Sequence, residues 1–441
     1  MIQKLNRIIE QKHGKDFGEV FRGAVVALIV KILAAGGGLL FNYGLARMFG
    51  AAGTGAYYST LSVITLAVVF GRFGLDLSAM RLIAPAYEKK EYDTLRALFS
   101  SSFYYILFIS SLCFLIVEIC APYIAQYIFE NEDLSTAIRV MGFSIVPMSL
   151  LFLYSEALRA IKKIKESQLF NFALGPFFNL LVLVILYFFF TGPQVIIASY
   201  SYVVAVVICF LIGIYFWKYR LFKPSRKLIN PESSLNRDLI ETACPFWGIM
   251  IVNYISDWSA ITILAFLETE NEVGIYALAL GTALLTSFFF RSVGIVIAPR
   301  FSVLAGQKRL KELEQLGKKS TRLMLLMSLP VLLIFFVFPE QIMGIYGEEF
   351  RSGATYLAII ALGQFIHLGT GNVGHVLMMT GYGKSARNNN FIGMCVNLLL
   401  MLILVPLMGV IGAAIAMTTA ILVQKTLALY MVRKYLGISL L

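Results

Sequence analysis

Ionisable side chains lie inside long apolar stretches of this 441-residue sequence, where they could bind a charged ligand or carry a proton. A charge at the centre of a membrane-spanning helix costs at least about 2.5 to 3.5 kcal/mol, so it usually faces a partner or a water-filled cavity. Four cations and four carboxylates occupy such positions: Lys31, Arg72, Arg291 and Lys425, and Asp76, Glu118, Glu156 and Asp257. Glu118 and Lys425 are nearer the ends of their stretches, so we expect them to reach the interface.

Arg72 and Arg291 are 219 positions apart, an offset at which the sequence resembles itself. Two related cations could face each other and clamp an anion through charge-assisted hydrogen bonds. The alternative for Arg72 is an ion pair with Asp76, four residues on and on the same helix face. Arg291 has no acidic residue within four positions. Lys31 lies in mid-span and therefore needs a polar partner, which Asp257 could supply. The substrate-binding candidates are Lys31, Arg72, Arg291 and Asp257.

A second set, Asp76, Asp257, Glu156 and His375, comprises the candidates for ion or proton coupling. Glu156 and His375 are also 219 positions apart, and His367 lies eight residues before His375 on the same predicted helix. One interpretation is a proton relay, and the other is a set of polar groups that only join helices.

The remaining motifs predict neither a cofactor nor a metal site. The segment GTGNVG at 369–374 matches a dinucleotide-binding pattern, but it lies within an apolar stretch with no preceding strand. The segment GKS at 383–385 lacks the first glycine of a phosphate-binding loop. The five cysteines show no CxxC spacing, and no loop is long enough to hold a catalytic domain. We therefore expect no enzyme activity.

These side chains must be positioned by membrane-spanning helices. The chain is 59% hydrophobic and 14% charged, with a mean hydropathy of +0.79, which excludes a water-soluble fold. Its apolar runs are about twenty residues long, as a bilayer-spanning helix requires. The sequence predicts an all-α integral membrane protein with about twelve spans: 22–46, 56–79, 97–119, 138–158, 169–190, 194–217, 239–266, 274–298, 323–344, 354–379, 391–408 and 410–432.

The two halves of the sequence match at an offset of 216 to 219 residues. Tyr57 meets Tyr276, Leu95 meets Leu313, Leu158 meets Leu377 and Asn179 meets Asn397. Each repeat holds an even number of spans, so we expect two six-helix lobes related by a pseudo-two-fold axis along the membrane normal. The predicted domains are an N-terminal lobe at 1–217, a cytoplasmic linker at 218–238 and a C-terminal lobe at 239–441.

The basic residues predict the orientation in the membrane. Of the 37 Lys and Arg residues, four lie deep within the predicted spans, and three, Arg47, Arg139 and Arg351, lie in the loops or at the span ends of one side. The other 30 flank the spans on the opposite side, which places both termini in the cytoplasm by the positive-inside rule. The net charge of +12 is spread over many short loops and forms no basic stripe, so we expect no nucleic-acid partner.

Several segments resemble polysaccharide-export flippases of the Wzx type, which carry O-antigen and related oligosaccharides. They are LARMFG at 45–50, GAY at 55–57, GLDLSAMR at 74–81, GYGK at 381–384, GVIGAAIA at 409–416 and RKYLGI at 433–438. The resemblance implies the fold of the multidrug/oligosaccharidyl-lipid/polysaccharide exporter superfamily, with a central cavity lined mainly by helices 1, 2, 7 and 8. Lys31, Arg72, Asp257 and Arg291 fall on those helices.

The resemblance implies a flippase that moves an undecaprenyl-pyrophosphate-linked oligosaccharide to the outer leaflet of a bacterial plasma (inner) membrane by alternating access. Expected partners are this lipid-linked oligosaccharide, membrane lipids, and the polymerase and glycosyltransferases of cell-surface polysaccharide or lipopolysaccharide biosynthesis. The alternative is an ion-coupled small-molecule (multidrug) exporter. Related drug exporters favour an acidic cavity, whereas the balanced charges here suit an anionic pyrophosphate. A membrane polysaccharide polymerase or ligase typically needs a large external loop, which this sequence lacks.

The charge distribution gives a topological prediction. Reporter fusions after residues 90, 163, 228, 315 and 385 should report the cytoplasm, and fusions near 131, 270 and 348 the external side, because basic loops are retained inside. A reproducible external signal at 228 or 315 would contradict the two-lobe arrangement.

Overall fold

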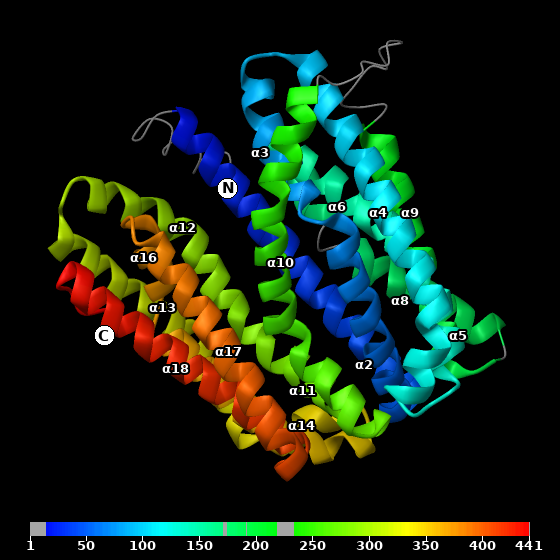
Figure 1. Ribbon diagram of the computed structural model, residues 1–441. Coiled ribbons are helices and arrows are strands. Elements are labelled where there is room, and N and C mark those ends of the chain that lie inside the picture. The colour runs from blue at the N-terminus through cyan, green and yellow to red at the C-terminus, as the bar shows by residue number, and fades with distance from the viewer. Residues whose placement is uncertain (1–14, 171–173, 191, 218–232, 441) are drawn as a thin grey trace. The chain divides into compact units, whose positions relative to one another are not determined.

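The computed structural model describes residues 15–170, 174–190, 192–217 and 233–440, and these ranges are helical with no strand (Figure 1). Contacts divide the chain into two compact units. One is Ile29–Trp258, and the other is Ser259–Leu441 together with the residues up to Leu28. The grouping follows packing within each unit, and the sequence-based lobes at 1–217 and 239–441 stay a prediction.

The unit Ile29–Trp258 contains helices that follow one another with short turns. The first, α2 (Lys15–Arg72), belongs to this unit from Ile29 on, and it is interrupted at Gly50, where φ is 67° and the backbone is not helical. It therefore consists of two spans in sequence. The others are α3 (Leu75–Glu88), α4 (Tyr92–Tyr127), α5 (Leu134–Gly142), α6 (Ile145–Ala160), α7 (Ile164–Gln168), α8 (Leu174–Phe189), α9 (Gln194–Tyr215) and the first part of α10 (Ser233–Leu267).

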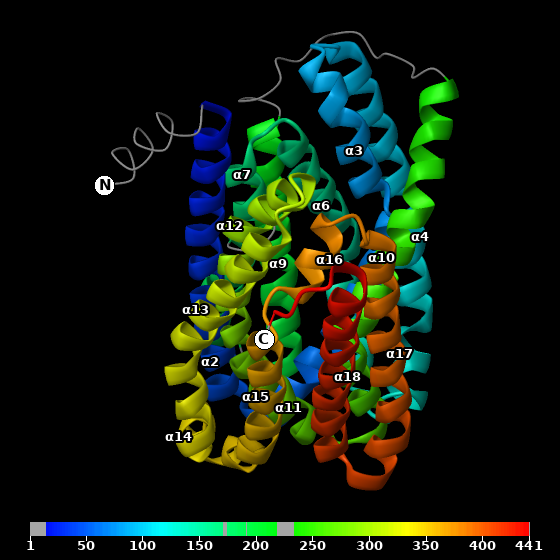
Figure 2. The same cartoon turned by 90° about the vertical axis from the view of Figure 1, so that its left-hand side faces the viewer.

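The unit that contains Ser259–Leu441 begins with the end of α10. It continues with α11 (Glu270–Ala283), the 3-10 turn η3 (Leu284–Thr286), α12 (Ser287–Gly306), α13 (Leu310–Val337), α14 (Pro339–Gly344), η4 (Glu348–Gly353), α15 (Ala354–Gly369), α16 (Val373–Met379), α17 (Gly383–Met408) and α18 (Val410–Leu436). Figures 1 and 2 show α17 and α18 side by side, joined at Gly409.

The helices confirm the predicted class of about twelve spans. Nine of the described helices are long and apolar enough to cross a membrane, and the bent pair of α5 and α6 makes a tenth. The interruption at Gly50 divides one of the nine into two spans, and the shorter apolar α8 supplies another. Two further predicted spans are broken: 274–298 passes through η3, and 354–379 is divided between α15 and α16.

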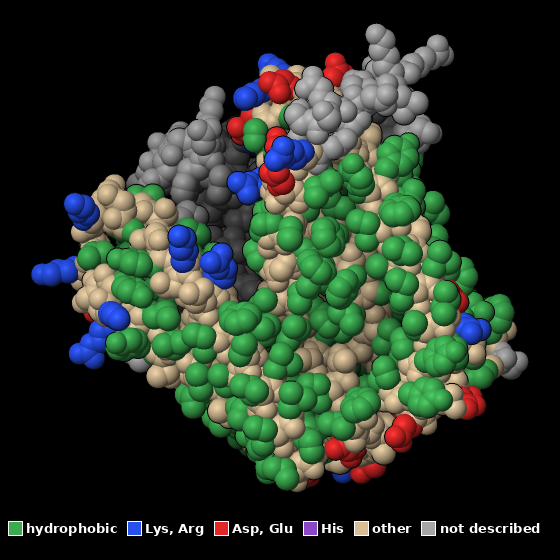
Figure 3. Space-filling model, in the orientation of Figure 1, with side chains coloured by type: hydrophobic (Ala, Val, Ile, Leu, Met, Phe, Trp, Pro, Cys, Tyr) green, Lys and Arg blue, Asp and Glu red, His purple; other side chains and the backbone are tan. Residues whose placement is uncertain are grey.

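The outer face of α4 carries the signature of lipid contact. Its exposed side chains from Tyr104 to Tyr123 are large and apolar, among them Phe108, Leu112, Leu115 and Ile119. Figure 3 shows hydrophobic side chains covering the face that carries α4, with charged side chains toward the helix ends. A soluble protein rarely exposes so large an apolar patch, so we infer that this surface contacts the lipid tails of a bilayer.

The landmarks that align the two halves occupy equivalent environments. Tyr57 and Tyr276 are almost fully buried, and so are the leucine pairs at 95 and 313 and at 158 and 377. The asparagines at 179 and 397 are buried too. Matched burial at matched sequence positions indicates that each half builds its own core from the same pattern.

The break between α2 and α3 is held against the first part of α10, within one unit. The Ser78 hydroxyl donates to the Leu239 carbonyl oxygen at 2.8 Å. The Trp247 ring packs on Phe73 with centroids 4.8 Å apart. Gly74 has φ +72°, and a Cβ there would lie 2.6 Å from the Trp247 backbone nitrogen. Only glycine fits both the left-handed conformation and the close approach.

Gly74→Ala should therefore destabilise the fold. The left-handed backbone costs a non-glycine residue about 1 to 2 kcal/mol, and the added methyl must displace α10 backbone as well. We expect a lower thermal unfolding midpoint for the purified protein in detergent. Gly248→Ala on α10, where nothing lies within 4 Å of an added Cβ, is the matched control and should not lower it. Equal midpoints for the two variants would contradict this role of Gly74.

Candidate functional site

The candidate cation Arg72 forms an ion pair with Asp76 across the break between α2 and α3. Its Nη1 lies 3.0 Å from Asp76 Oδ2, and the side chains are 15% and 1% exposed. The alternative that the sequence raised for Arg72 is thus present in the structure. Since Gly74 allows the chain to turn between the two residues, the spacing of four positions brings their charges together even without a continuous helix.

An aromatic ring covers the other side of the Arg72 guanidinium. Its central carbon lies 4.0 Å from the centroid of the Phe152 ring on α6, a favourable cation–π distance. Arg72 Nε and Asp76 Oδ1 are buried and have no hydrogen-bond partner among the described residues. Each member of the pair therefore keeps a polar atom that a ligand, a water molecule or a new partner could satisfy.

The other three substrate-binding candidates are placed less completely. Lys31 lies on α2 and Arg291 on α12, and both side chains are outside the part of the chain that the structure describes. Asp257 lies on α10, and its side chain is exposed. A joint binding site for these residues stays a prediction.

The coupling candidates are divided between the two units. Glu156 on α6 is buried and lies 2.9 Å from Arg159 Nη2. His375 on α16 is half-buried, and its ring centroid lies 5.8 Å from that of Phe290. The ring centroid of His367 lies 4.4 Å from that of Phe290. The expectation of one continuous helix through both histidines is wrong, because the chain breaks at Gly371, where φ is +68°.

Lys425 is a buried lysine, which corrects the expectation that it reaches the interface. It is only 7% exposed, and its Nζ lies 5.1 Å from the centroid of the Phe290 ring. No carboxylate lies within ion-pair distance of it among the described residues. Lys425 therefore joins His367 and His375 in one polar cluster around Phe290, within the unit that contains Ser259–Leu441.

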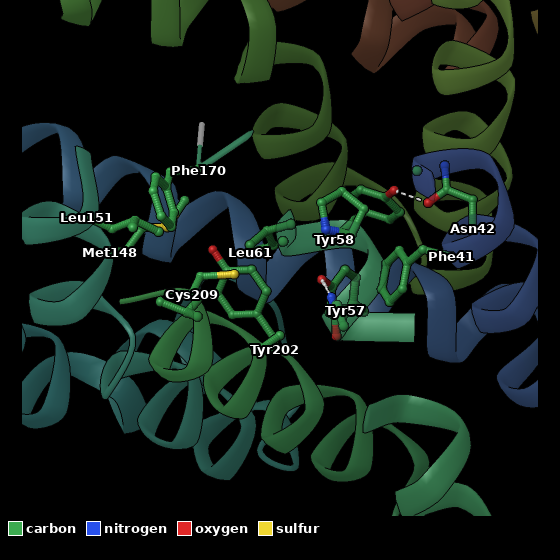
Figure 4. A pocket seen from close by; sticks show the side chains of 16 residues that line it. Phe41, Asn42, Tyr57, Tyr58, Leu61, Met148, Leu151, Phe170, Tyr202 and Cys209 are labelled. Atoms are coloured by element: carbon green, nitrogen blue, oxygen red, sulfur yellow. Dashed lines mark hydrogen bonds between the residues drawn. The ribbon is translucent and has the colours of Figure 1, made fainter. Parts of the chain in front are cut away.

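A pocket of about 340 Å³ lies inside the unit Ile29–Trp258, and the sequence did not predict it. Its walls come from α2, α6, α8 and α9 and from Phe170 before α8, and none of the lining residues that the structure describes is charged. Figure 4 shows Phe41, Tyr57 and Tyr58 beside Asn42, with Phe170, Met148 and Leu151 at the other end. The available signals were Asn42, a polar side chain inside an apolar span, and the matched landmarks Tyr57 and Asn179.

Hydrogen bonds fix the polar end of this pocket. The Tyr58 hydroxyl donates to Asn42 Oδ1 at 2.7 Å. The Tyr57 hydroxyl accepts a bond from Asn179 Nδ2 at 3.1 Å, and Asn179 Oδ1 in turn accepts from the Ser201 hydroxyl at 2.8 Å. These bonds hold two amides and two phenols in place, which suits recognition of a polar, uncharged group.

Comparisons with known proteins agree with a transport role. Residues 20–305 match the sequence family described as polysaccharide biosynthesis protein, and residues 245–403 match the MatE family. The chain is 26% identical to an uncharacterized membrane protein of Methanocaldococcus jannaschii, over 82% of this chain and 73% of that protein. It is also 26% identical to a probable low-salt glycan biosynthesis flippase, Agl15, of Haloferax volcanii, over 54% of this chain and 50% of that protein.

The fold is similar to that of the lipid II flippase MurJ in an inward closed conformation. The TM-score is 0.76 at 16% identity, over 93% of this chain and 87% of that one. At this identity the similarity establishes the fold, and any cargo has to be argued from the side chains of this chain.

The buried ion pair leads to a stability prediction. Arg72→Ala and Asp76→Ala should each destabilise the protein by about 3 to 5 kcal/mol, because each leaves an uncompensated buried charge, whereas the double variant should lose less than the sum of the two. The free energy of unfolding in detergent, measured for the two single variants and the double variant, tests both expectations. The exposed pair of Arg237 and Glu241, 2.7 Å apart, supplies the control, and Arg237→Ala should cost far less than either buried variant. The interpretation fails if the three single variants behave alike.

Proposed function

The chain belongs to the polysaccharide biosynthesis protein family, and we propose that it moves a polyprenyl-pyrophosphate-linked oligosaccharide from the cytoplasmic to the outer leaflet. It is a multi-pass membrane flippase or transporter of the multidrug/oligosaccharidyl-lipid/polysaccharide exporter superfamily. The family is described as polysaccharide biosynthesis protein, and the relative from Haloferax volcanii is a probable glycan biosynthesis flippase, which supports this cargo.

The observation that carries the proposal is the extent of the family match. Residues 20–305 make up more than half of the chain and include Lys31, Arg72, Asp257 and Arg291. All four substrate-binding candidates therefore lie in the part that resembles polysaccharide biosynthesis proteins. Cations at membrane depth are expensive, and an anionic cargo accounts for their presence.

The proposed chemistry is recognition of a pyrophosphate by charge-assisted hydrogen bonds. A pyrophosphate that leaves water needs donors that carry positive charge. Lys31 and Arg291 would supply two of them. Arg72 could add another by releasing Asp76, and the unsatisfied Nε of Arg72 gives it a donor even while the pair persists. If a phosphate oxygen replaced Asp76 as the partner of Arg72, opening of the ion pair would be coupled to substrate binding.

The same proposal assigns coupling to Asp76, Asp257, Glu156 and His375, which could bind an ion or proton during alternating access. It also places the protein in a bacterial plasma membrane, with both termini on the cytoplasmic side. The polymerase and the glycosyltransferases of the pathway would be its functional partners, since the first consumes the flipped oligosaccharide and the others assemble it.

A multidrug exporter is the second candidate, and the MatE match over residues 245–403 favours it. The two candidates differ in the sign of the cargo charge. Lipophilic cations would be attracted by carboxylates, and a lipid pyrophosphate by Lys and Arg.

Deletion of the gene should leave lipid-linked oligosaccharide in the cytoplasmic leaflet and remove the surface polymer. The wild-type gene should restore the polymer. Lys31→Ala and Arg291→Ala should reduce transport at least about tenfold, since a lost charge-assisted bond is worth about 1.5 to 3 kcal/mol. Accessibility of the oligosaccharide from outside the cell, at equal protein levels, is the measurement.

Arg351→Ala is the matched control, because Arg351 is an exposed cation paired with Glu348 at 3.1 Å in η4. This variant should restore the surface polymer of the deletion strain to the wild-type level. Normal polymer in the deletion strain, together with hypersensitivity to cationic dyes, would instead identify a drug exporter. Full transport by Arg291→Ala would reject the anion-clamp role of that residue.

A further inference from the structure

The uncharged pocket of the unit Ile29–Trp258 has the properties of a small-molecule site. Its volume of about 340 Å³ falls within the range of about 300 to 1,000 Å³ that ligand pockets occupy. It combines aromatic walls with a few fixed polar groups. A charged ligand would find no counter-charge among the described lining residues, and an uncompensated charge is costly in an apolar setting.

The polar atoms that face this pocket are hydrogen-bond donors and acceptors without charge. Because Asn42 Oδ1 is occupied by the Tyr58 hydroxyl, the Asn42 amide nitrogen remains as a donor and has no partner among the described residues. The Tyr202 hydroxyl also has no partner in that part of the chain. The Tyr57 hydroxyl accepts from Asn179, so its own hydrogen stays available.

The aromatic rings around these atoms are inclined to one another. The ring centroids of Phe41 and Tyr57 are 5.5 Å apart at 54°, and those of Tyr57 and Tyr202 are 6.4 Å apart at 79°. Inclined rings present faces in more than one direction. The apolar C–H face of a saturated, hydroxylated ring can pack on such a face while its hydroxyl groups bond to the amide and phenols.

The repeat distinguishes the pocket residues that both halves share from those found in only one half. Tyr57 and Asn179 have the counterparts Tyr276 and Asn397, and all four are buried, so this pair is part of the shared core. At the offset of 219 that relates Tyr57 to Tyr276, however, Asn42 corresponds to Ile261 and Tyr58 to Ala277. Tyr202 corresponds to Ile421 at the same offset. The hydrogen-bonding lining is therefore particular to one unit and is not required to build the fold.

We propose that this pocket binds one neutral sugar ring, with Asn42, Tyr58 and Tyr202 as its polar contacts and Phe41 and Tyr57 as its stacking surfaces. Where that sugar belongs to a lipid-linked oligosaccharide, the inference rests on the proposed function. The pocket then recognises an uncharged part of the cargo, separately from the cations that bind its pyrophosphate.

The test uses the full chain, purified in detergent, with saturation-transfer NMR against glucose, galactose, mannose and N-acetylglucosamine at millimolar concentration. At least one of these sugars should bind. Tyr202→Phe removes one hydroxyl and Asn42→Ala removes the amide, so each should weaken binding about three- to tenfold. Tyr200→Phe is the matched control, because Tyr200 lies two positions away on α9 and is exposed. Its affinity should equal that of the wild type.

Absence of binding by all four sugars, or equal binding by Tyr202→Phe and Tyr200→Phe, overturns the proposal. So does binding of ethidium that Tyr202→Phe weakens while no sugar competes, since the pocket would then hold organic cations. The flippase assay keeps the two proposals apart. Sugar binding with normal surface polymer in the deletion strain rejects only the flippase, whereas loss of polymer on deletion with no sugar binding rejects only the pocket.

Discussion

A polar group in hydrocarbon has no water to bond with, and this constraint governs the whole chain. Backbone N–H and C=O groups must bond within a helix, and a helix can break only where other groups cover the exposed ends. The break at Phe73 and Gly74 obeys this rule, since α10 packs against it and Ser78 bonds to the Leu239 carbonyl. Side chains follow the same rule: Glu156 lies beside Arg159, and the Asn179 amide bonds to Tyr57 and Ser201.

The same constraint explains why most of the fold was predictable. Spans need long apolar runs, so the twelve spans could be located from hydropathy, and the spacing of Arg72 and Asp76 was enough to raise their pairing as an alternative. The breaks were not predicted, because they depend on covering groups distant in the sequence. Gly371, for example, is covered by Thr321 of α13 and separates His367 from His375.

The candidate site was less predictable, because a sequence shows where charges are and not what surrounds them. Lys425 lies well inside a helix packed on α17, so its side chain cannot reach the interface as its sequence position suggested. The pocket around Asn42 and Tyr202 was missed for the opposite reason. Its residues are uncharged, come from four helices and resemble ordinary packing residues, so only their arrangement distinguishes them.

The ion pair of Arg72 and Asp76 has a consequence for the electrical behaviour of the protein. Moving one elementary charge through the membrane field involves about 2.3 kcal/mol per 100 mV, but a pair that moves together carries no net charge and exchanges almost no energy with the field. Lys425, when protonated, has no such compensation among the described residues. Any voltage dependence that arises from these three residues should therefore follow Lys425, and opening of the pair would add to it only while its members move apart.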